Sequence, residues 1–384
     1  MKHFFVSIII FSSFQLYAQD GKNFNVKDFG AKGDGIADDT KSIQQCFDNA
    51  TSRGGGTVII PQGDYKTSKN LFLNFHSDVS LKITGQNATI YPTDKYYYIF
   101  CDNSDKNNKK PLGSLSISGV NINAEKLPHP QSFYYDNPSC AYGLFLTNLK
   151  AIDIQNCTFS NIYGSAIKLV LLKDVNDTTA STTVSVKNNK ILNCWGLNPT
   201  KDYLDKKNPQ KFVYDNYGDG VAIWGYRNAV IDGNYIFNDV SKTGYYGRGG
   251  VVVEADGENS VITNNVINGY DRGVHIEGDK GGHYIANNKI SGSQVAIYFW
   301  LADNFKNRPV KIENNTFSYK NEAEKYNLKT IVGDRKFIMF AGKGTSTYQG
   351  SIVKNNTFLD QPNSNKLIMQ AGDLQINKVG NKVQ

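Results

Sequence analysis

Short apolar runs separated by glycine and asparagine recur along the second half of the chain. Within each run, apolar positions alternate with polar or variable ones, a pattern typical of half-buried β-strands. Five runs align as one column: GVAIWGY (220–226), GVVVEAD (250–256), GVHIEGD (273–279), AIYFWLA (296–302) and FIMFAGK (337–343). The recurrence predicts that one structural unit is repeated along the chain.

A second column lies between these runs and consists of asparagines that precede Ile or Phe by two positions. Its members are Asn189, Asn234, Asn265, Asn288, Asn315 and Asn356. Asn265 and Asn288 are 23 residues apart, and longer steps fit the same unit with an inserted loop. A period in the twenties predicts a solenoid whose coils stack as parallel strands, whereas a barrel or sandwich would require short polar hairpin turns throughout. We therefore predict an all-β parallel β-helix in a single domain, residues 19–384.

The N-terminal part of the chain adds two features to this prediction. Residues 38–50 offer Asp38, Asp39 and Thr40 as helix caps before apolar residues at helical spacing, which predicts a short helix covering the first coil. Residues 1–18 combine Lys2, an apolar run and a small residue, Ala18, as a secretory signal peptide does. We expect cleavage near Ala18 and a secreted, periplasmic or extracellular protein. The run is too short to span a membrane, and no later segment is apolar enough.

Composition narrows the classes of partner and cofactor. The net charge of +7 is compatible with a polyanionic ligand, but no basic run or recognised motif indicates a nucleic-acid-binding protein. Five scattered cysteines without CxxC spacing argue against a zinc site and a disulfide framework; at most one bridge is left open, and buried thiols are favoured. We expect a monomer.

Residues 24–68, FNVKDFGAKGDGIADDTKSIQQCFDNATSRGGGTVIIPQGDYKTS, resemble the N-terminal signature of the pectate-lyase-like superfamily. The similarity is to its rhamnogalacturonase/epimerase-like and polygalacturonase-related branch. It implies a right-handed parallel β-helix, with residues 24–68 as N-terminal cap and first coil, that binds or cleaves a polysaccharide on its outer face. The superfamily includes hydrolases, lyases, epimerases and phage tailspikes, so the resemblance does not define the chemistry.

The known catalytic motifs of these relatives are absent from the sequence. The polygalacturonase set of Asn-Thr-Asp, Asp-Asp, Gly-His-Gly and Arg-Ile-Lys is missing, and the one Asp-Asp pair, Asp38-Asp39, lies in the capping segment. The Tyr-Gly-x-Asp-Pro-His box of mannuronan epimerases is missing as well. No catalytic residue can therefore be transferred from either family.

Candidate site residues come from the alternation within the first column. If Val251, Val253, Val274 and Ile276 face the core, the other positions of each strand face solvent. The outward set comprises Trp224, Tyr226, Glu254, Asp256, His275, Glu277, Asp279, Tyr298 and Trp300. Acids and a histidine are thus framed by aromatic residues, on which sugar rings stack.

This set predicts an inverting glycoside hydrolase. Two residues along a strand are about 6.5–7 Å apart, within the acid-to-base spacing of inverting glycosidases. We assign Glu254 as the general acid and Asp256 as the base. Glu277, roughly 5 Å away on the next coil, either modulates the pKa of Glu254 or replaces it as the acid. The Glu-x-Asp arrangement resembles that of iota-carrageenase-type hydrolases.

Flanking residues complete the predicted cleft. We expect His275, the aromatic residues Trp224, Tyr226, Tyr298 and Trp300, and the loop residues Tyr245 and Tyr246 to contact substrate. Arg248 and Arg272 precede the acidic strands and could grip a substrate carboxylate or sulfate. The substrate is therefore expected to be an acidic or sulfated polysaccharide. Each of these candidates also has an explanation without a functional role. The aspartates could be turn residues, the glutamates solvated strand ends, and the arginines surface residues.

Two other functions remain open. In a Ca²⁺-dependent polysaccharide lyase, the ion would be held by Glu254, Asp256, Glu277 and Asp279. A nearby Arg272 or Lys280 would abstract the proton at C5 of a uronate. In a non-catalytic carbohydrate-binding β-helix, the aromatic residues would serve equally well but the acids would have no task. The hydrolase requires no cofactor and no metal.

Overall fold

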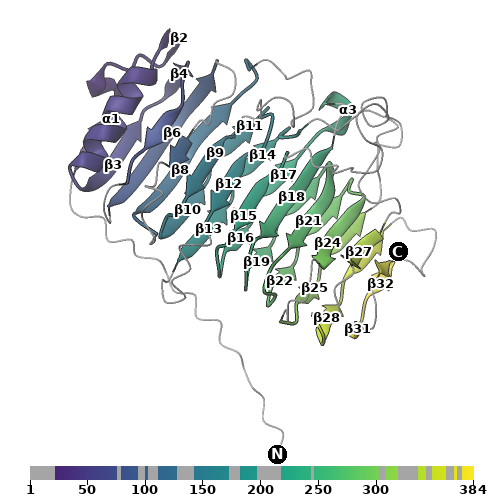
Figure 1. Ribbon diagram of the computed structural model, residues 1–384. Helices are drawn as coiled ribbons and strands as arrows, with labels where there is room; N and C mark the ends of the chain where they lie inside the picture. Colours follow the sequence, from purple (N-terminus) through teal and green to yellow (C-terminus); the bar gives the residue numbers. More distant parts are fainter. Residues whose placement is uncertain are drawn as a thin grey trace, which may run out of the picture.

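The chain winds into an elongated stack of coils, most of which contribute three short strands (Figure 1). The computed structural model describes residues 22–75, 79–93, 100–102, 111–127, 142–172, 182–196, 218–243, 246–301, 308–318, 336–342, 348–359, 367–369 and 374–384. The coil of β19 (Val261–Thr263), β20 (Val266–Asn268) and β21 (Tyr270–Glu277) pairs strand by strand, in parallel, with the following coil. The predicted parallel β-helix is confirmed.

One face of the stack is a sheet of ten parallel strands in the described part of the chain, here called the site sheet. Its strands are β5 (Leu71–Leu73), β7 (Phe100–Asp102), β9 (Leu144–Thr147), β12 (Ile167–Val170), β15 (Val221–Trp224), β18 (Gly247–Glu254), β21, β24 (Val295–Leu301), β27 (Lys336–Gly342) and β30 (Ile368–Met369). The five runs of the first sequence column are β15, β18, β21, β24 and β27, so the predicted stacking of these runs is correct.

The other faces form one continuous sheet in two rows. The first row contains β1 (Asn23–Asn25), β3 (Gly55–Ile60), β10 (Ala151–Gln155), β13 (Thr183–Lys187), β16 (Val230–Asp232), β19, β22 (Tyr284–Ala286), β25 (Lys311–Glu313), β28 (Ser351–Lys354) and β31 (Ile376–Val379). The second contains β2 (Asp34–Asp38), β4 (Gly63–Thr67), β11 (Thr158–Ser160), β14 (Lys190–Leu192), β17 (Tyr235–Phe237), β20, β23 (Lys289–Ser291), β26 (Thr316–Ser318), β29 (Thr357–Leu359) and β32 (Lys382–Val383). Two long strands, β6 (Ser80–Pro92) and β8 (Ser114–Asn123), pair in both rows.

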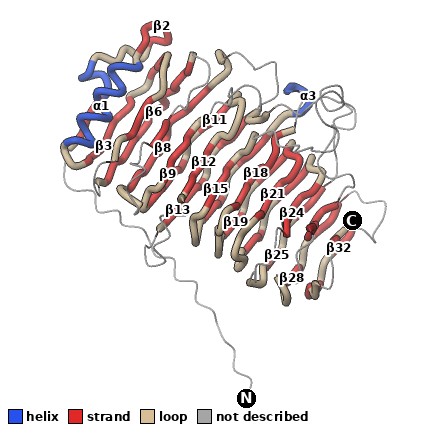
Figure 2. Tube along the Cα trace, viewed as in Figure 1, coloured by secondary structure: helices blue, strands red, loops and turns tan. Residues whose placement is uncertain are grey.

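The helical elements are few. After the 3₁₀ helix η1 (Val26–Phe29), the helix α1 (Thr40–Ser52) covers the N-terminal end of the stack, and a short helix, α3 (Val240–Thr243), lies beyond β17 (Figure 2). Helix α1 buries Ile43, Cys46, Phe47 and Ala50. The predicted capping helix is therefore present, and it shields core side chains that an open first coil would expose to water. None of the described helices is long and apolar enough to cross a membrane.

The asparagine column forms a buried ladder at the bend between the two rows. The side-chain oxygen of Asn288 accepts hydrogen bonds from the backbone and side-chain nitrogens of Asn265, both at 3.0 Å. Asn288 in turn donates to Asn315 and to the carbonyl oxygen of Ile262. The residue before each ladder position adopts positive φ, as Asn287 does at 58°. Asparagine therefore satisfies the buried polar groups at a bend where the strand ladder is interrupted.

The ladder gives the first testable prediction. Replacing Asn288 by alanine leaves two buried donors of Asn265 and the carbonyl of Ile262 without their partner, at a cost of about 2–3 kcal/mol in the free energy of unfolding. Replacing the exposed neighbour Asn287 by glycine, which tolerates the same positive φ, should change it by less than about 1 kcal/mol. Denaturant unfolding of both variants checks this, and equal losses would contradict the account.

The remaining sequence predictions on the fold concern the core, the cysteines and the signal peptide. The predicted inward residues Val221, Ile223, Val251 and Val253 all lie in the core. Three cysteines, Cys46, Cys157 and Cys194, are buried free thiols; burial raises the pKa of each to about 12, so they are poor nucleophiles. The proposed signal peptide and Cys140 lie outside the described residues, as does the side chain of Cys101.

Candidate active site

A row of four side chains crosses the outer surface of the site sheet. Trp224 of β15 is in register with Glu254 of β18, Glu254 with Glu277 of β21, and Glu277 with Trp300 of β24. Because adjacent strands are about 4.8 Å apart, the row places the two carboxylates side by side between two indoles. We call these four residues the site row. The predicted register of the acids and tryptophans is correct.

A second row of side chains lies two residues earlier along three of the same strands. Its members Val252, His275 and Tyr298 are in register, and Arg272 lies beside them with its guanidinium carbon 5.1 Å from the centre of the Tyr298 ring. His275 is 1% exposed and packs edge-on against the Tyr298 ring. This row therefore supports the site row and leaves little of its own surface to solvent.

Glu254 is held by a buried arginine. The Arg248 guanidinium binds both oxygens of Asp219 at 2.7 Å and places Nη1 3.3 Å from Oε1 of Glu254. The backbone N–H of Gly249 also donates to Asp219, which fixes that carboxylate. An arginine is always protonated in proteins, so this arrangement stabilises the carboxylate form of Glu254.

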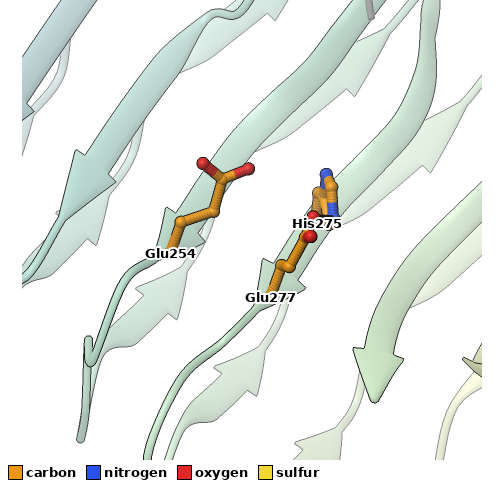
Figure 3. Close-up of side chains that lie close together, drawn as sticks. All are labelled: Glu254, His275 and Glu277. Atoms are coloured by element: carbon orange, nitrogen blue, oxygen red, sulfur yellow. Dashed lines mark ion pairs between the residues drawn. The ribbon is translucent and has the colours of Figure 1, made fainter. Parts of the chain in front are cut away.

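Glu277 is held by His275, and the contacts of the ring favour one tautomer. Arg272 Nη1 lies 2.6 Å from Nδ1 and 3.4 Å from Nε2 of His275; because an arginine can only donate, we assign the lone pair to Nδ1, the nearer nitrogen. The ring proton then resides on Nε2, which is 3.1 Å from Oε2 of Glu277 and donates to it (Figure 3). His275 is therefore a neutral donor that orients Glu277, and its one lone pair is already engaged.

Electrostatics keep His275 in this neutral form. Burial first, then the charges of Arg272 and Arg248, lower the pKa of His275 well below its ordinary value. A protonated ring would also lose the hydrogen bond from Arg272, because Nδ1 would become a donor. The group cannot readily act as a general base or acid near neutral pH.

The same shift predicts how stability depends on pH. The folded-state pKa lies below the unfolded one, so acidification below pH about 6.5 protonates the unfolded chain first and destabilises the fold. His275 alone contributes a slope of up to about 1.4 kcal/mol per pH unit in that window, with stability rising as pH rises. Denaturant unfolding between pH 7.5 and 5.5 should show a flatter slope for His275→Gln than for the parent. An unchanged slope would contradict the neutral assignment.

The fit of a divalent cation can be tested on the same contacts. Glu254, His275 and Glu277 place ligand atoms within 4.8 Å of one another, a spacing compatible with one ion. Two guanidinium groups, however, already contact this trio, and the His275 nitrogen that faces Glu277 carries a proton. The donor set therefore does not fit Ca²⁺, and Asp279, a predicted ligand, is not part of it.

Two predicted outer residues lie inside the cylinder instead. Tyr226 is fully buried in the core, where its hydroxyl donates to the carbonyl oxygen of Leu149. Asp279 is 1% exposed and accepts hydrogen bonds from His283, Gly281 N–H and the Tyr348 hydroxyl. Each strand ends just before these residues, at Trp224 and at Glu277, so alternation no longer applies to them. Tyr226 cannot stack on a substrate and Asp279 cannot reach a metal at the site row.

Asp256 also lies outside the strand, in the turn that follows it. Strand β18 ends at Glu254, and Ala255 and Asp256 adopt positive φ of 54° and 68°. The turn places Asp256 opposite Lys280, with Oδ1 4.0 Å from Nζ. The strand spacing that suggested an inverting Glu254–Asp256 pair is therefore absent, because Asp256 lies in a turn.

The predicted substrate contacts fall into two groups. Trp300 is 41% exposed and Trp224 is partly exposed, as stacking requires. Arg248, Arg272, His275 and Tyr298 are buried and engaged with neighbouring side chains, so they position the site row. Tyr246 is buried against Val240, and Tyr245 lies outside the described residues.

Two residues of the site were missed in the sequence. Asp219 is 29 positions from Arg248, and its Asp-Gly sequence is indistinguishable from a turn. Lys168 of β12 packs its ammonium 4.0 Å from the centre of the Trp224 ring. The apolar run AIKLV at 166–170 was the available signal, because it continues the first column by one coil.

The fold and the site row define a class: parallel β-helix proteins with an acidic, aromatic-flanked outer face. The family model described as "Rhamnogalacturonase A/epimerase, pectate lyase-like" matches residues 23–324, and the chain belongs to this family. The resemblance of residues 24–68 to this superfamily is thereby confirmed.

The chain matches only part of the length of individual relatives. Plasmin and fibronectin-binding protein A of Streptococcus pneumoniae is 31% identical over 164 residues, which are 39% of this chain and 22% of that protein. Alginate lyase 7 of Azotobacter vinelandii is 60% identical over 45 residues, 12% of this chain and 5% of that one. The chain therefore matches well under two thirds of each of these relatives.

Solved structures extend the similarity of fold over the whole stack. The Streptococcus pneumoniae surface protein and adhesin PfbA is similar with a TM-score of 0.61 at 20% identity, over 94% of this chain and 97% of that one. An exopolygalacturonase from Thermotoga maritima is similar with a TM-score of 0.56 at 13% identity, over 96% and 92%. At these identities the likeness shows the fold alone, and it includes both an adhesin and a hydrolase.

Proposed function

We propose that this protein is an exported polysaccharide hydrolase that cleaves glycosidic bonds with Glu254 and Glu277. The observation that carries the proposal is the site row itself, two carboxylates in register between two partly exposed indoles. Its carboxylates have different partners, a permanent cation for Glu254 and a neutral imidazole for Glu277. Paired carboxyl groups in unlike environments are the arrangement that acid–base assignment in glycosidases requires.

The spacing supports a retaining mechanism. One carboxylate oxygen of Glu254 and one of Glu277 lie no more than 4.8 Å apart, which is closer than the spacing of an inverting pair. Retaining glycosidases hold their carboxyl groups about 5–5.5 Å apart, and inverting ones about 6.5–9.5 Å. The inverting mechanism suggested by the sequence relied on Asp256, which is in a turn, so the retaining pair replaces it.

The contacts favour one assignment of roles. Glu254 is 12% exposed and paired with Arg248, which suits the ionised nucleophile. Glu277 is 39% exposed and contacts a neutral histidine, which suits the proton donor. Two carboxyl groups this close share one proton more readily than they both ionise, and the permanent cation beside Glu254 favours the proton on Glu277. The sequence had left this alternative, Glu277 as the acid, open.

The reaction then proceeds in two balanced steps. The Glu254 carboxylate attacks the anomeric carbon while Glu277 transfers its proton to the glycosidic oxygen, so the leaving sugar departs as a neutral alcohol. Water next attacks the glycosyl ester, Glu277 accepts the water proton, and Glu254 is released as a carboxylate. His275 donates to Oε2 of Glu277 throughout, which orients the carboxyl group without changing its own proton.

Two alternatives remain. A lyase would require a base and a charge-neutralising group for a uronate; the His275 lone pair is engaged by Arg272, so this alternative has less support. A binding role without turnover is favoured by the 31% identity over 164 residues to a plasmin- and fibronectin-binding protein.

A panel of neutral, acidic and sulfated polysaccharides tests the proposal. Incubation with the purified protein should release new reducing ends from at least one polysaccharide, and proton NMR should show that the first-formed product keeps the anomeric configuration. Products with an unsaturated uronide chromophore would indicate the lyase. Binding without any product would contradict the hydrolase and support the adhesin-like role.

A further inference from the structure

We propose that the sugar unit bound at the site row carries no negative charge. This inference rests on the proposed function, and it replaces the expectation of an acidic or sulfated substrate at this position. It concerns the one sugar ring that lies over Glu254 and Glu277; sugar units further along the chain are not constrained by it.

The arginines expected to bind a substrate anion are buried beside carboxylates of the protein. Arg248 is 3% exposed, and its fork is closed by Asp219, with the third nitrogen next to Glu254. Arg272 is 7% exposed and lies against His275, the ring of Tyr298 and, at 3.8 Å, the Asp271 carboxylate. Neither guanidinium presents a bidentate edge to a ligand on the outer surface.

The groups that do reach the surface of the site row are carboxylates and indoles. Glu277 is 39% exposed and Trp300 is 41% exposed, whereas the cations behind them are almost completely covered. With His275 neutral and one proton shared by Glu254 and Glu277, as the proposed mechanism requires, the pair carries one negative charge. Together with Asp219 and Asp271, against Arg248 and Arg272, this leaves an excess of one negative charge near the row. A carboxylate or sulfate within about 5 Å of this pair would be repelled, and partial desolvation by the indoles would strengthen that repulsion.

Lys168 does not reverse this balance at the site row. Lys168 on β12 is 9% exposed, and its ammonium packs 4.0 Å from the centre of the ring of Trp224, the residue in register with Glu254 on the side away from Glu277. This ammonium is engaged with the indole and the residue is buried, so it presents little cationic surface to an anionic ligand. A neutral ring that uses its hydroxyl groups on the carboxylates and its apolar face on Trp300 suits this surface better than a uronate does.

Matched monosaccharide pairs test the inference without any turnover: glucose and glucuronate, galactose and galacturonate, mannose and mannuronate. The members of each pair differ only at C6, where an alcohol replaces a carboxylate. Binding to the full chain at pH 7 is measured by ligand-observed NMR. For every pair that binds, the neutral member should bind about tenfold tighter or more.

Charge variants supply the control. The double variant Glu254→Gln/Glu277→Gln should narrow the gap between the members of a pair severalfold, because it removes the negative charge that the two glutamates share. Glu313→Gln, a matched change on β25 in the other sheet, should leave the gap unchanged. A uronate that binds as tightly as its neutral partner, or a site that binds no member of any pair, would overturn the inference. An enzyme that cleaves polysaccharide but prefers uronates would keep the proposed function, whereas neutral preference without turnover would keep only this inference.

Discussion

Replacing Glu254 or Glu277 by glutamine is expected to reduce turnover of the polysaccharide by about 10²–10⁴-fold. Glutamine keeps the shape and the hydrogen-bonding reach of the side chain but can neither attack as a carboxylate nor deliver a proton at neutral pH. Loss of Glu254 should stop formation of the glycosyl ester. Loss of Glu277 should slow substrates with poor leaving groups most, because these depend on protonation. Reducing-end assays on a cleaved polysaccharide measure both effects.

Asp256→Asn is the matched control for these variants. Asp256 lies two residues after Glu254 but in a turn next to Lys280, so this variant should keep turnover within about threefold of the parent. Sugar affinity should survive in all three variants, because the indoles of the site row remain. If Asp256→Asn is as damaging as Glu254→Gln, the original pairing of Glu254 with Asp256 is correct and the site row is not the catalytic pair.

The second large effect concerns stability. Asp279→Ala should lower the free energy of unfolding by about 3–5 kcal/mol, because it removes the acceptor for three buried donors. These donors are Nε2–H of His283, the backbone N–H of Gly281 and the hydroxyl of Tyr348. His283 cannot turn to another partner, since its Nδ1 already accepts from the backbone N–H of Ser260. Urea or guanidinium unfolding checks the loss.

Asp256→Asn serves as the control here as well. Asp256 occupies the place of Asp279 in the preceding coil, yet it is partly exposed and contacts only Lys280 among the described ion pairs. Its replacement should cost less than about 1 kcal/mol. Similar losses for Asp256→Asn and Asp279→Ala would mean that burial and hydrogen bonding do not distinguish the two aspartates.

The stacking of the coils could be predicted from the sequence because the same residue pattern recurs from coil to coil. Three successive coils, those of residues 220–226, 250–256 and 273–279, place a glycine and a β-branched run at the same phase, and the asparagine column continues beyond them, so aligning the columns gives the register directly. The Asn265–Asn288 rung and the pairing of Trp224, Glu254, Glu277 and Trp300 both follow from that alignment. Alternation within a strand then assigned the residues inside the strands to the correct side.

The prediction failed where the strands end and where contacts are distant. Gly225 at φ 74° and Ala255 at φ 54° turn the backbone, so the sides of Tyr226 and Asp256 could not be inferred from alternation. The Arg248–Asp219 pair joins β18 to a residue two positions before β15, in the preceding coil, and neither residue repeats in a column. Without this pair Arg248 seemed available to a substrate, and the negative excess of the site row was not apparent.

The most direct test of the account is a crystal structure of Glu277→Gln with a bound oligosaccharide from a cleaved polysaccharide. The account predicts a sugar ring over Glu254 beside the indole of Trp300, with its anomeric carbon facing the Glu254 carboxylate. The glycosidic oxygen should lie about 2.6–3.2 Å from the side-chain amide of residue 277. An oligosaccharide bound on another face of the β-helix, or one that crosses the site sheet without contacting either glutamate, would contradict it.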